Sequence, residues 1–293
     1  IGLLAMFIAI GMNIPNLWIT YEYSKETIRG KTELSTEKEN RTSGLDKDYA
    51  VDWSYGIGET MTLFIPYARG GATYSSIPES SNLYKAFLKQ NIPASEAKKY
   101  IKQVPTYWGP QNGTAGPTYA GAIIIFLFIL ALMVADKKYK WWLIAATVLS
   151  ILLAWGKNFM PFTNLFLEYL PGYNKFRAVS MTLIIAELTI PLLAILGLQA
   201  LLDSKMQLKD KLLRLYIAGG ISAGIALIFA LFSKNMFEFN SLMDGQIQSA
   251  YPEWYFNAVK SDRSYLLQRD AWRSFALIIL SAGAIWLYLK GIL

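Results

Sequence analysis

The feature that most constrains this chain is the grouping of its apolar residues into six long runs. The runs cover residues 1–14, 119–135, 141–155, 181–202, 215–232 and 275–289. In a water-soluble protein, apolar residues recur at helical or strand spacing, so that one face of each element is buried. Here they form continuous blocks, which is not the pattern of a water-soluble core. Trp and Tyr at the ends of several runs extend their reach toward the roughly 20 residues that cross a bilayer. The pattern predicts an all-α, polytopic membrane helix bundle, with a buried or re-entrant helix as the alternative for residues 141–155.

The amino-acid composition excludes several classes of catalytic and metal-binding site. Charged residues make up 17% of the chain, below the roughly 25% of ordinary soluble domains, and hydrophobic residues make up 54%. The chain has no cysteine and no histidine, which excludes thiol nucleophiles, imidazole bases, disulfides and the usual zinc sites. The net charge of +7 comes from short basic segments beside apolar runs, where cations orient a membrane protein. We therefore expect a membrane-lipid partner, no nucleic-acid partner and no metal site.

The loops between the runs predict the topology. Segments 136–140 and 203–214 are short and basic and should be cytoplasmic, so the long segments should face outward. We expect a bacterial cytoplasmic membrane location and, because residue 1 lies inside an apolar run, a fragment of a longer protein. The predicted parts are a partial transmembrane helix (1–14), an extracytoplasmic loop domain (15–118), a transmembrane bundle (119–232), an outer loop with an interfacial helix (233–274) and a last transmembrane helix (275–293).

Two groups of cations lie on the predicted outer side. Lys175 and Arg177, in LPGYNKFRAVSM, precede the run 181–202 at a place where topology disfavours positive charge. They are interpreted either as ligands of a lipid-linked phosphate or as unspecific headgroup contacts. In TYEYSKETIRGKTEL, Glu22, Lys25 and Arg29 have helical spacing. This spacing fits either a salt-bridged helix surface or an acid/base and phosphate-binding rim.

A third group occupies VDWSYGIGETMTLFIPYARGG, where Trp53 and Tyr55 could stack on a sugar. Glu59 in the same segment could bind hydroxyl groups or remove a proton. Glu187 lies in the middle of an apolar run, where a carboxylate indicates a cavity, a partner or a hydrogen bond between helices.

Two further patterns concern packing and the membrane surface. The spacing of Gly220 and Gly224 predicts close helix packing. Residues 252–274 read as an interfacial amphipathic helix that leads into the last transmembrane run. Its arginines, Arg263, Arg269 and Arg273, would then contact either lipid phosphate or water.

Four ordered segments together resemble one family. YEYSKETIRGKTEL, WSYGIGETMTLFIP followed by ARGG, LPGYNKFRAVSM and SDRSYLLQRDAWRS are similar to segments of YfhO-like bacterial membrane proteins, in the form found in Bacteroidetes. The resemblance spans most of the chain. The matching residues are Glu22, Lys25, Arg29, Trp53, Glu59, Gly70, Gly71, Lys175 and Arg177.

The resemblance implies a GT-C type glycosyltransferase, which moves a sugar from a polyprenyl-phosphate carrier to an envelope polymer or lipid. It assigns carrier-phosphate binding to Arg177 and Lys175, and leaves Glu22 and Glu59 as the catalytic candidates within this chain. Lys25, Arg29, Trp53 and Tyr55 complete the predicted substrate-binding set. The key acidic residue of the family would precede this fragment, and a divalent cation is left open as a cofactor. A transporter or flippase of lipid-linked sugars, or a non-catalytic scaffold, are the alternatives.

Overall fold

The computed structural model describes residues 2–27, 42 and 44–292. These residues form helices and irregular segments and contain no β-strand; one antiparallel bridge joins Ser75 to Val104. The all-α prediction is confirmed for this part of the chain. The chain divides into two compact units. Unit 1 comprises residues 1–54 and 155–181, and unit 2 comprises residues 55–154 and 182–293.

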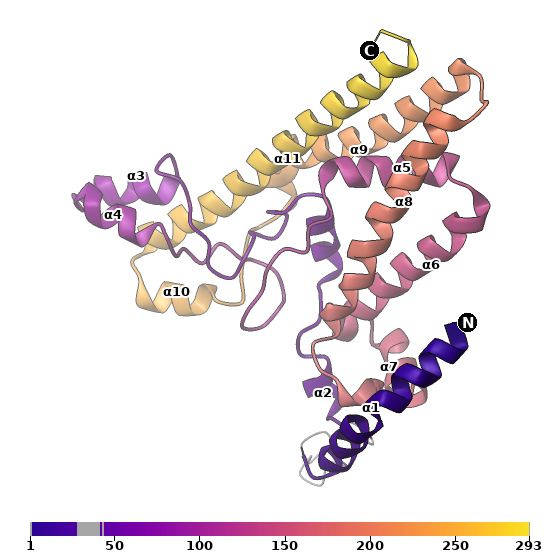
Figure 1. The fold of residues 1–293 in the computed structure, drawn as a ribbon. Helices are drawn as coiled ribbons and strands as arrows, with labels where there is room; N and C mark the ends of the chain where they lie inside the picture. Colours follow the sequence, from indigo (N-terminus) through magenta and orange to yellow (C-terminus); the bar gives the residue numbers. More distant parts are fainter. Residues whose placement is uncertain (1, 28–41, 43, 293) are drawn as a thin grey trace. The chain divides into compact units, whose positions relative to one another are not determined.

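Unit 1 is built from one long apolar helix and several short elements (Figure 1). Its elements are α1 (Gly2–Lys25), α2 (Lys47–Ala50), η3 (Gly156–Phe159), α7 (Met160–Tyr169) and η4 (Tyr173–Lys175). A small core forms around Val51, Leu167 and Val179. α1 has no buried residue although its first half is largely apolar, which suits a helix surrounded by lipid.

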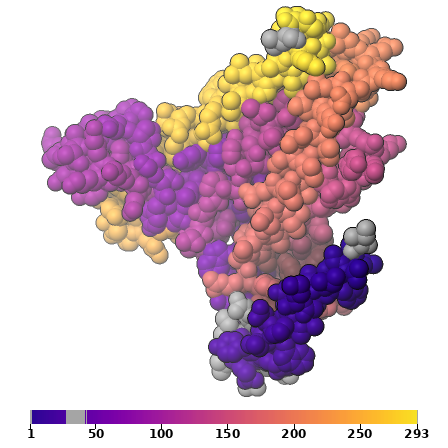
Figure 2. Space-filling view, in the orientation of Figure 1, coloured from indigo at the N-terminus to yellow at the C-terminus, as the bar shows by residue number. Residues whose placement is uncertain are grey.

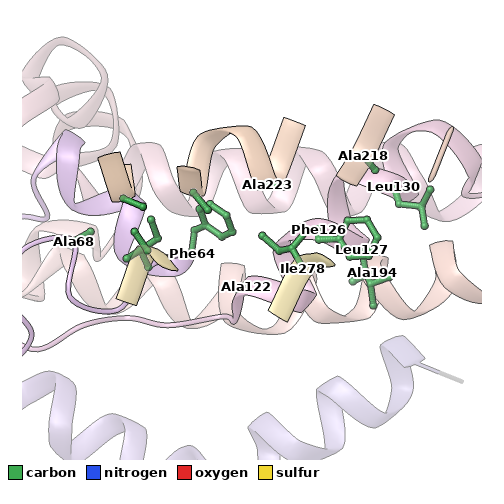
Figure 3. Close-up of a cluster of buried hydrophobic side chains, with 14 of the residues drawn as sticks. Phe64, Ala68, Ala122, Phe126, Leu127, Leu130, Ala194, Ala218, Ala223 and Ile278 are labelled. Carbon is green, nitrogen blue, oxygen red and sulfur yellow. The ribbon is translucent and has the colours of Figure 1, made fainter. Parts of the chain in front are cut away.

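Unit 2 contains a helix bundle. Its helices are α5 (Ala122–Val134), α6 (Lys137–Ala154), α8 (Leu183–Asp203), α9 (Leu208–Met236) and α11 (Glu253–Leu289). α9 packs along α11, and α8 packs against α5 and α6 (Figure 1). Apolar side chains such as Phe126, Ala194 and Ile278 fill the space between these helices (Figure 3). A Cβ on Gly197 would lie 2.2 Å from the Cβ of Ala131, so the crossing of α8 over α5 requires glycine.

The remainder of unit 2 surrounds the N-terminal half of α11. It contains η2 (Ile57–Leu63), α3 (Asn82–Lys89), α4 (Ala94–Tyr100) and α10 (Asp244–Ala250). In Figure 2, α3 and α4 appear in purple to magenta, and their apolar side chains share one core with α10 and the N-terminal half of α11. The carboxylate of Asp262 on α11 accepts hydrogen bonds from the backbone N–H groups of Asn82 (2.7 Å) and Leu83 (2.8 Å). The Asp262 carboxylate thus pairs with backbone N–H groups in the first turn of α3, which have no partner within the helix.

The number of candidate spans is smaller than the six predicted. Four described helices are long and apolar enough to cross a membrane: α1, Val179–Asp203, α9 and α11. A fifth is reached if Lys137–Ala154 and Gly156–Tyr169 count as one broken span. The run 119–135 forms a helix of only 13 residues, roughly 20 Å long, against a bilayer core of roughly 30 Å. α6 ends at Ala154, and this stretch fits either a broken span or the re-entrant alternative.

The loop domain predicted for residues 15–118 is not one body. α1 continues to Lys25, residues up to Ser54 belong to unit 1, and the segment from Tyr55 onward belongs to unit 2. The hydrophobic pattern could not reveal this division, because it depends on which distant segments each half packs against.

Two packing expectations were wrong. Arg263 contacts neither lipid nor water: it is fully buried, pairs with Asp244 at 2.8 Å and donates to the carbonyl oxygens of Phe239 and Pro105, each at 3.0 Å. Among the described residues, a Cβ on Gly220 or Gly224 would meet no atom within 4 Å. The GxxxG spacing therefore does not mark a helix contact within this part of the chain.

Candidate functional site: a cleft beside α9 and α11

The predicted site residues fall into both units. Unit 1 holds Glu22, Lys25, Trp53, Lys175 and Arg177, and unit 2 holds Tyr55, Glu59 and Glu187. Arg29 lies outside the described residues. Each unit is therefore described by itself, with the contacts that its own members of the predicted set make.

Arg177 and Trp53 are in contact, as a shared substrate site would need. The guanidinium carbon of Arg177 lies 4.6 Å from the Trp53 ring centre and 5.2 Å from that of Tyr49, and its Nη1 donates to the Tyr49 hydroxyl. No carboxylate pairs with Arg177 among the ion pairs of the described residues. The side chain is exposed, so its remaining donors can meet an anion. Lys175 lies two residues earlier in η4, partly buried.

Glu22 and Lys25 form an exposed ion pair of 2.8 Å at the end of α1. The Lys25 ammonium also lies 4.5 Å from the Tyr21 ring centre. This arrangement is the salt-bridged helix surface that the spacing allowed. An exposed pair of this kind contributes little to stability.

Glu59 is buried and held by several donors. Its Oε2 accepts hydrogen bonds from the Gly56 backbone N–H (2.6 Å) and the Gln111 amide (3.1 Å), and its Oε1 accepts one from the Tyr107 hydroxyl. A Cβ on Gly109 would lie 2.4 Å from Glu59 Oε1, so only glycine permits the approach. The carboxylate thus fastens η2 to residues 107–111, a structural role that its sequence position did not reveal.

Tyr55 has no exposed face on which a sugar could stack. It is 2% exposed, packs with Leu63 and Leu183, and shares a hydrogen bond with the Thr62 hydroxyl. Burial raises the pKa of Tyr55 to about 12. The predicted substrate contact is wrong for this residue, because its ring belongs to the core of unit 2.

Arg69 is a cation that the sequence reading passed over. Its guanidinium carbon lies 4.4 Å from the Trp108 ring centre and 5.5 Å from that of Phe237. Burial lowers the pKa of Arg69, while the charge of Glu59 acts in the opposite direction. The next residue, Gly70, has a φ of 86°, and a Cβ there would clash with the Thr106 carbonyl oxygen, so this position of the ARGG segment requires glycine.

Glu187 lies on the outer face of α8 beside Ile184 and Leu188, and all three side chains are exposed. It lines neither of the two cavities of unit 2 that are described below. A hydrogen bond between helices, one of the sequence interpretations, is not formed within unit 2.

A cleft of about 1040 Å³ runs along the C-terminal end of α9 and the N-terminal half of α11. We call it the α9–α11 cleft. Its polar lining combines two ammonium groups, one carboxylate and four amides: Lys234, Lys260, Glu238, Asn82, Asn235, Asn257 and Gln268. Phe237, Phe239 and Tyr265 add aromatic surface. Such a mixture of hydrogen-bonding and aromatic groups suits a polyhydroxylated or anionic ligand.

Two polar side chains at the cleft are placed to contact a ligand. Ser264 is 6% exposed and lines the cleft, and its hydroxyl oxygen has no hydrogen-bond partner among the described residues. Buried polar atoms are normally paired, so a bound group would satisfy it. The Lys260 ammonium donates to Asn240 Oδ1 at 2.9 Å, which holds the cation at the rim.

The cleft lies where α9 changes from apolar to polar. Leu231 and Phe232 are exposed apolar residues, and Lys234 follows in the last turn of the helix. A cation at the end of a spanning helix lies at the depth of lipid headgroups. Sequence reasoning did not single out Lys234 or Lys260, although their position beside an apolar run was the available signal.

Comparisons with known proteins add no relative, since no protein family, curated protein or solved structure matches this chain. Within the described residues, no three acidic side chains gather closely enough to hold a metal ion.

Proposed function

We propose that this chain belongs to a polytopic membrane protein of the GT-C type, related to the YfhO-like proteins. It transfers a sugar from a polyprenyl-phosphate carrier to an envelope polymer or lipid, on the outer face of the bacterial cytoplasmic membrane. The observation that carries the proposal is the α9–α11 cleft, in which amides, aromatic rings and two lysines meet at the end of an apolar helix.

The chemistry of such a transfer fits these groups. An acceptor hydroxyl forms a bond to the anomeric carbon of the sugar, the bond to the carrier phosphate breaks, and the hydroxyl proton leaves to a base. Negative charge grows on the departing phosphate, and cations placed in advance stabilise it. Lys234 and Lys260 would take this role in the cleft. Arg177 remains a predicted phosphate ligand, supported by its exposed position and its stacking on Trp53.

The test uses the purified protein in proteoliposomes, a polyprenyl phosphate that carries a radiolabelled sugar, and an envelope fraction as acceptor. We expect the label to move to the acceptor while free polyprenyl phosphate accumulates. Lys260→Ala should slow transfer roughly tenfold, equivalent to about 1.4 kcal/mol of barrier. Lys209→Ala, an exposed lysine at the other end of α9, is the matched control and should transfer at the normal rate.

The same experiment separates the alternatives. A transporter would move the labelled lipid across the vesicle membrane with its sugar still attached. A scaffold would neither move nor cleave it. Either result, with protein that is folded and correctly inserted, would contradict the proposal.

A further inference from the structure

A second cavity in unit 2 differs from the α9–α11 cleft in its charge. It measures about 440 Å³ and lies between residues 73–74, residues 107–113 and the segment from Ser241 to Gln246. We call it the Tyr107 pocket. Its side chains are hydroxyls, amides, two tyrosine rings and two apolar groups, and no Lys, Arg, Asp or Glu lines it. The α9–α11 cleft, by contrast, contains two lysines and a glutamate.

The uncharged wall of this pocket is fixed from behind. The Tyr107 hydroxyl donates to Glu59 and accepts from the Gln111 backbone N–H at 2.9 Å, and the Gln111 amide donates to Glu59 at 3.1 Å. Burial, and then the charge of Glu59, raise the pKa of Tyr107, so its phenol stays neutral. Two lining side chains are therefore held in place by a carboxylate that does not itself line the pocket.

Two other lining side chains are accessible to a ligand. Tyr74 is 53% exposed, and Gln246 on α10 is also exposed. Aromatic faces stack on the C–H faces of sugar rings, and amides pair with sugar hydroxyls. The negative charge of Glu59 behind the wall disfavours an anionic ligand.

We propose that the Tyr107 pocket binds an uncharged saccharide. We identify this saccharide as the sugar acceptor, or as the sugar unit of the acceptor nearest to the reaction. That identification rests on the proposed function, whereas the binding of a neutral saccharide does not. The division of charge between the two cavities supports that identification, because the carrier phosphate is anionic and a sugar hydroxyl is neutral.

The test measures binding of neutral trisaccharides built from hexose, N-acetylhexosamine or pentose units to the purified protein in detergent, by calorimetry or saturation-transfer NMR. An acidic trisaccharide of uronic acid is the comparison. We expect at least one neutral trisaccharide to bind more tightly than the acidic one. Tyr74→Ala and Gln246→Ala should weaken that binding roughly tenfold, about 1.4 kcal/mol.

Two controls separate loss of a contact from loss of folding. Tyr74→Phe keeps the ring and should retain most of the affinity. Gln248→Ala changes an exposed glutamine two residues along α10 that does not line the pocket, and should bind normally. Failure of every neutral probe, or equal losses at Gln246 and Gln248, would overturn the inference. If saccharide binding persists while the carrier lipid is never cleaved, the proposed function fails and the neutral pocket stands.

Discussion

At the scale of single residues, Glu59 has two possible roles that can be tested against each other: the catalytic role predicted from the sequence and the structural role indicated by its hydrogen bonds. Glu59→Gln keeps the size of the side chain but replaces one carboxylate oxygen by an NH2 group. In the wild-type protein both oxygens accept hydrogen bonds, so in the variant at least one donor faces another donor. Because hydrogen bonds to a buried charge are involved, we expect a loss of roughly 1.5–3 kcal/mol in unfolding free energy. Chemical unfolding in detergent measures it.

The control for Glu59 is Glu253→Gln, which changes an exposed carboxylate at the start of α11. Because Glu253 lies in the first turn of α11, where a carboxylate interacts favourably with the helix dipole, the loss for this variant should stay below about 1 kcal/mol. A Glu59→Gln protein of normal stability that has lost sugar transfer would instead support the catalytic role and contradict the structural one.

Tyr55 makes stability sensitive to alkaline pH. Its pKa is raised to about 12 in the folded chain, mainly by burial, from 10.0. Between these values the unfolded chain has lost the phenol proton and the folded chain has kept it, so unfolding becomes easier as pH rises. The expected loss from this group is about 1.4 kcal/mol per pH unit, absent below pH ~10. Comparing unfolding of wild type and Tyr55→Phe from pH 8 to 11.5 should show a shallower decline in the variant, and equal slopes would disprove the assignment.

Arg177, in unit 1, is a predicted phosphate ligand that is tested separately from the lysines of the α9–α11 cleft. Arg177→Ala removes a guanidinium that stacks on Trp53 and Tyr49. We expect sugar transfer to be lost while membrane insertion and protein abundance stay normal. Arg177→Lys keeps the charge without the planar donor fork and should recover only part of the rate. Full transfer by Arg177→Ala would remove this residue from the phosphate site.

At the scale of elements, Arg263 links α11 to segments that line both cavities of unit 2. Arg263 anchors Phe239, which lines the α9–α11 cleft, and Asp244, which follows the residues that line the Tyr107 pocket. Arg263→Ala leaves Asp244 without its buried partner, which should cost roughly 3–5 kcal/mol. Thermal unfolding in detergent measures the loss. Arg269→Ala, exposed on the same helix, should cost far less, and equal losses would contradict the anchoring role.

The elements themselves were partly predictable. The apolar spacing of residues 79–90 and 93–104, with Pro93 at the start of the second segment, predicts two short helices. α3 and α4 form there, because both signals are local. The amphipathic pattern of residues 252–274 also indicated a helix that continues into the last apolar run, as α11 does. The burial of Arg263 was not predictable, since its partners lie 19 to 158 residues away in sequence.

The candidate site was predictable only in part. Arg177 and Trp53 were chosen for their chemistry, and the fold brings them together. The polar lining of the α9–α11 cleft comes from three separate stretches, around residues 82, 234–239 and 257–268, and nothing in their local composition announces a cavity. Tyr55 and Glu59 look like a sugar-binding pair in sequence, but burial directs both side chains inward.

At the scale of the whole molecule, the topology can be read directly because the chain has no cysteine. Single cysteines introduced as Lys209→Cys and Gln248→Cys flank α9. We expect a membrane-impermeant thiol reagent to label the cysteine at 248 in intact cells and the one at 209 only after permeabilisation. The prediction follows from α9 as a spanning helix and from the basic segment before it. Labelling of both positions in intact cells would contradict it.

The most direct test of the central claim is photo-crosslinking with a polyprenyl phosphate that carries a sugar and a diazirine next to the phosphate. The protein is irradiated in proteoliposomes, and the modified peptides are mapped by mass spectrometry. The account predicts modification within residues 234–239 and 257–268, reduced by Lys260→Ala and by excess unlabelled carrier. Modification confined to the exposed face of α8 around Glu187, or none that the unlabelled carrier displaces, would contradict it.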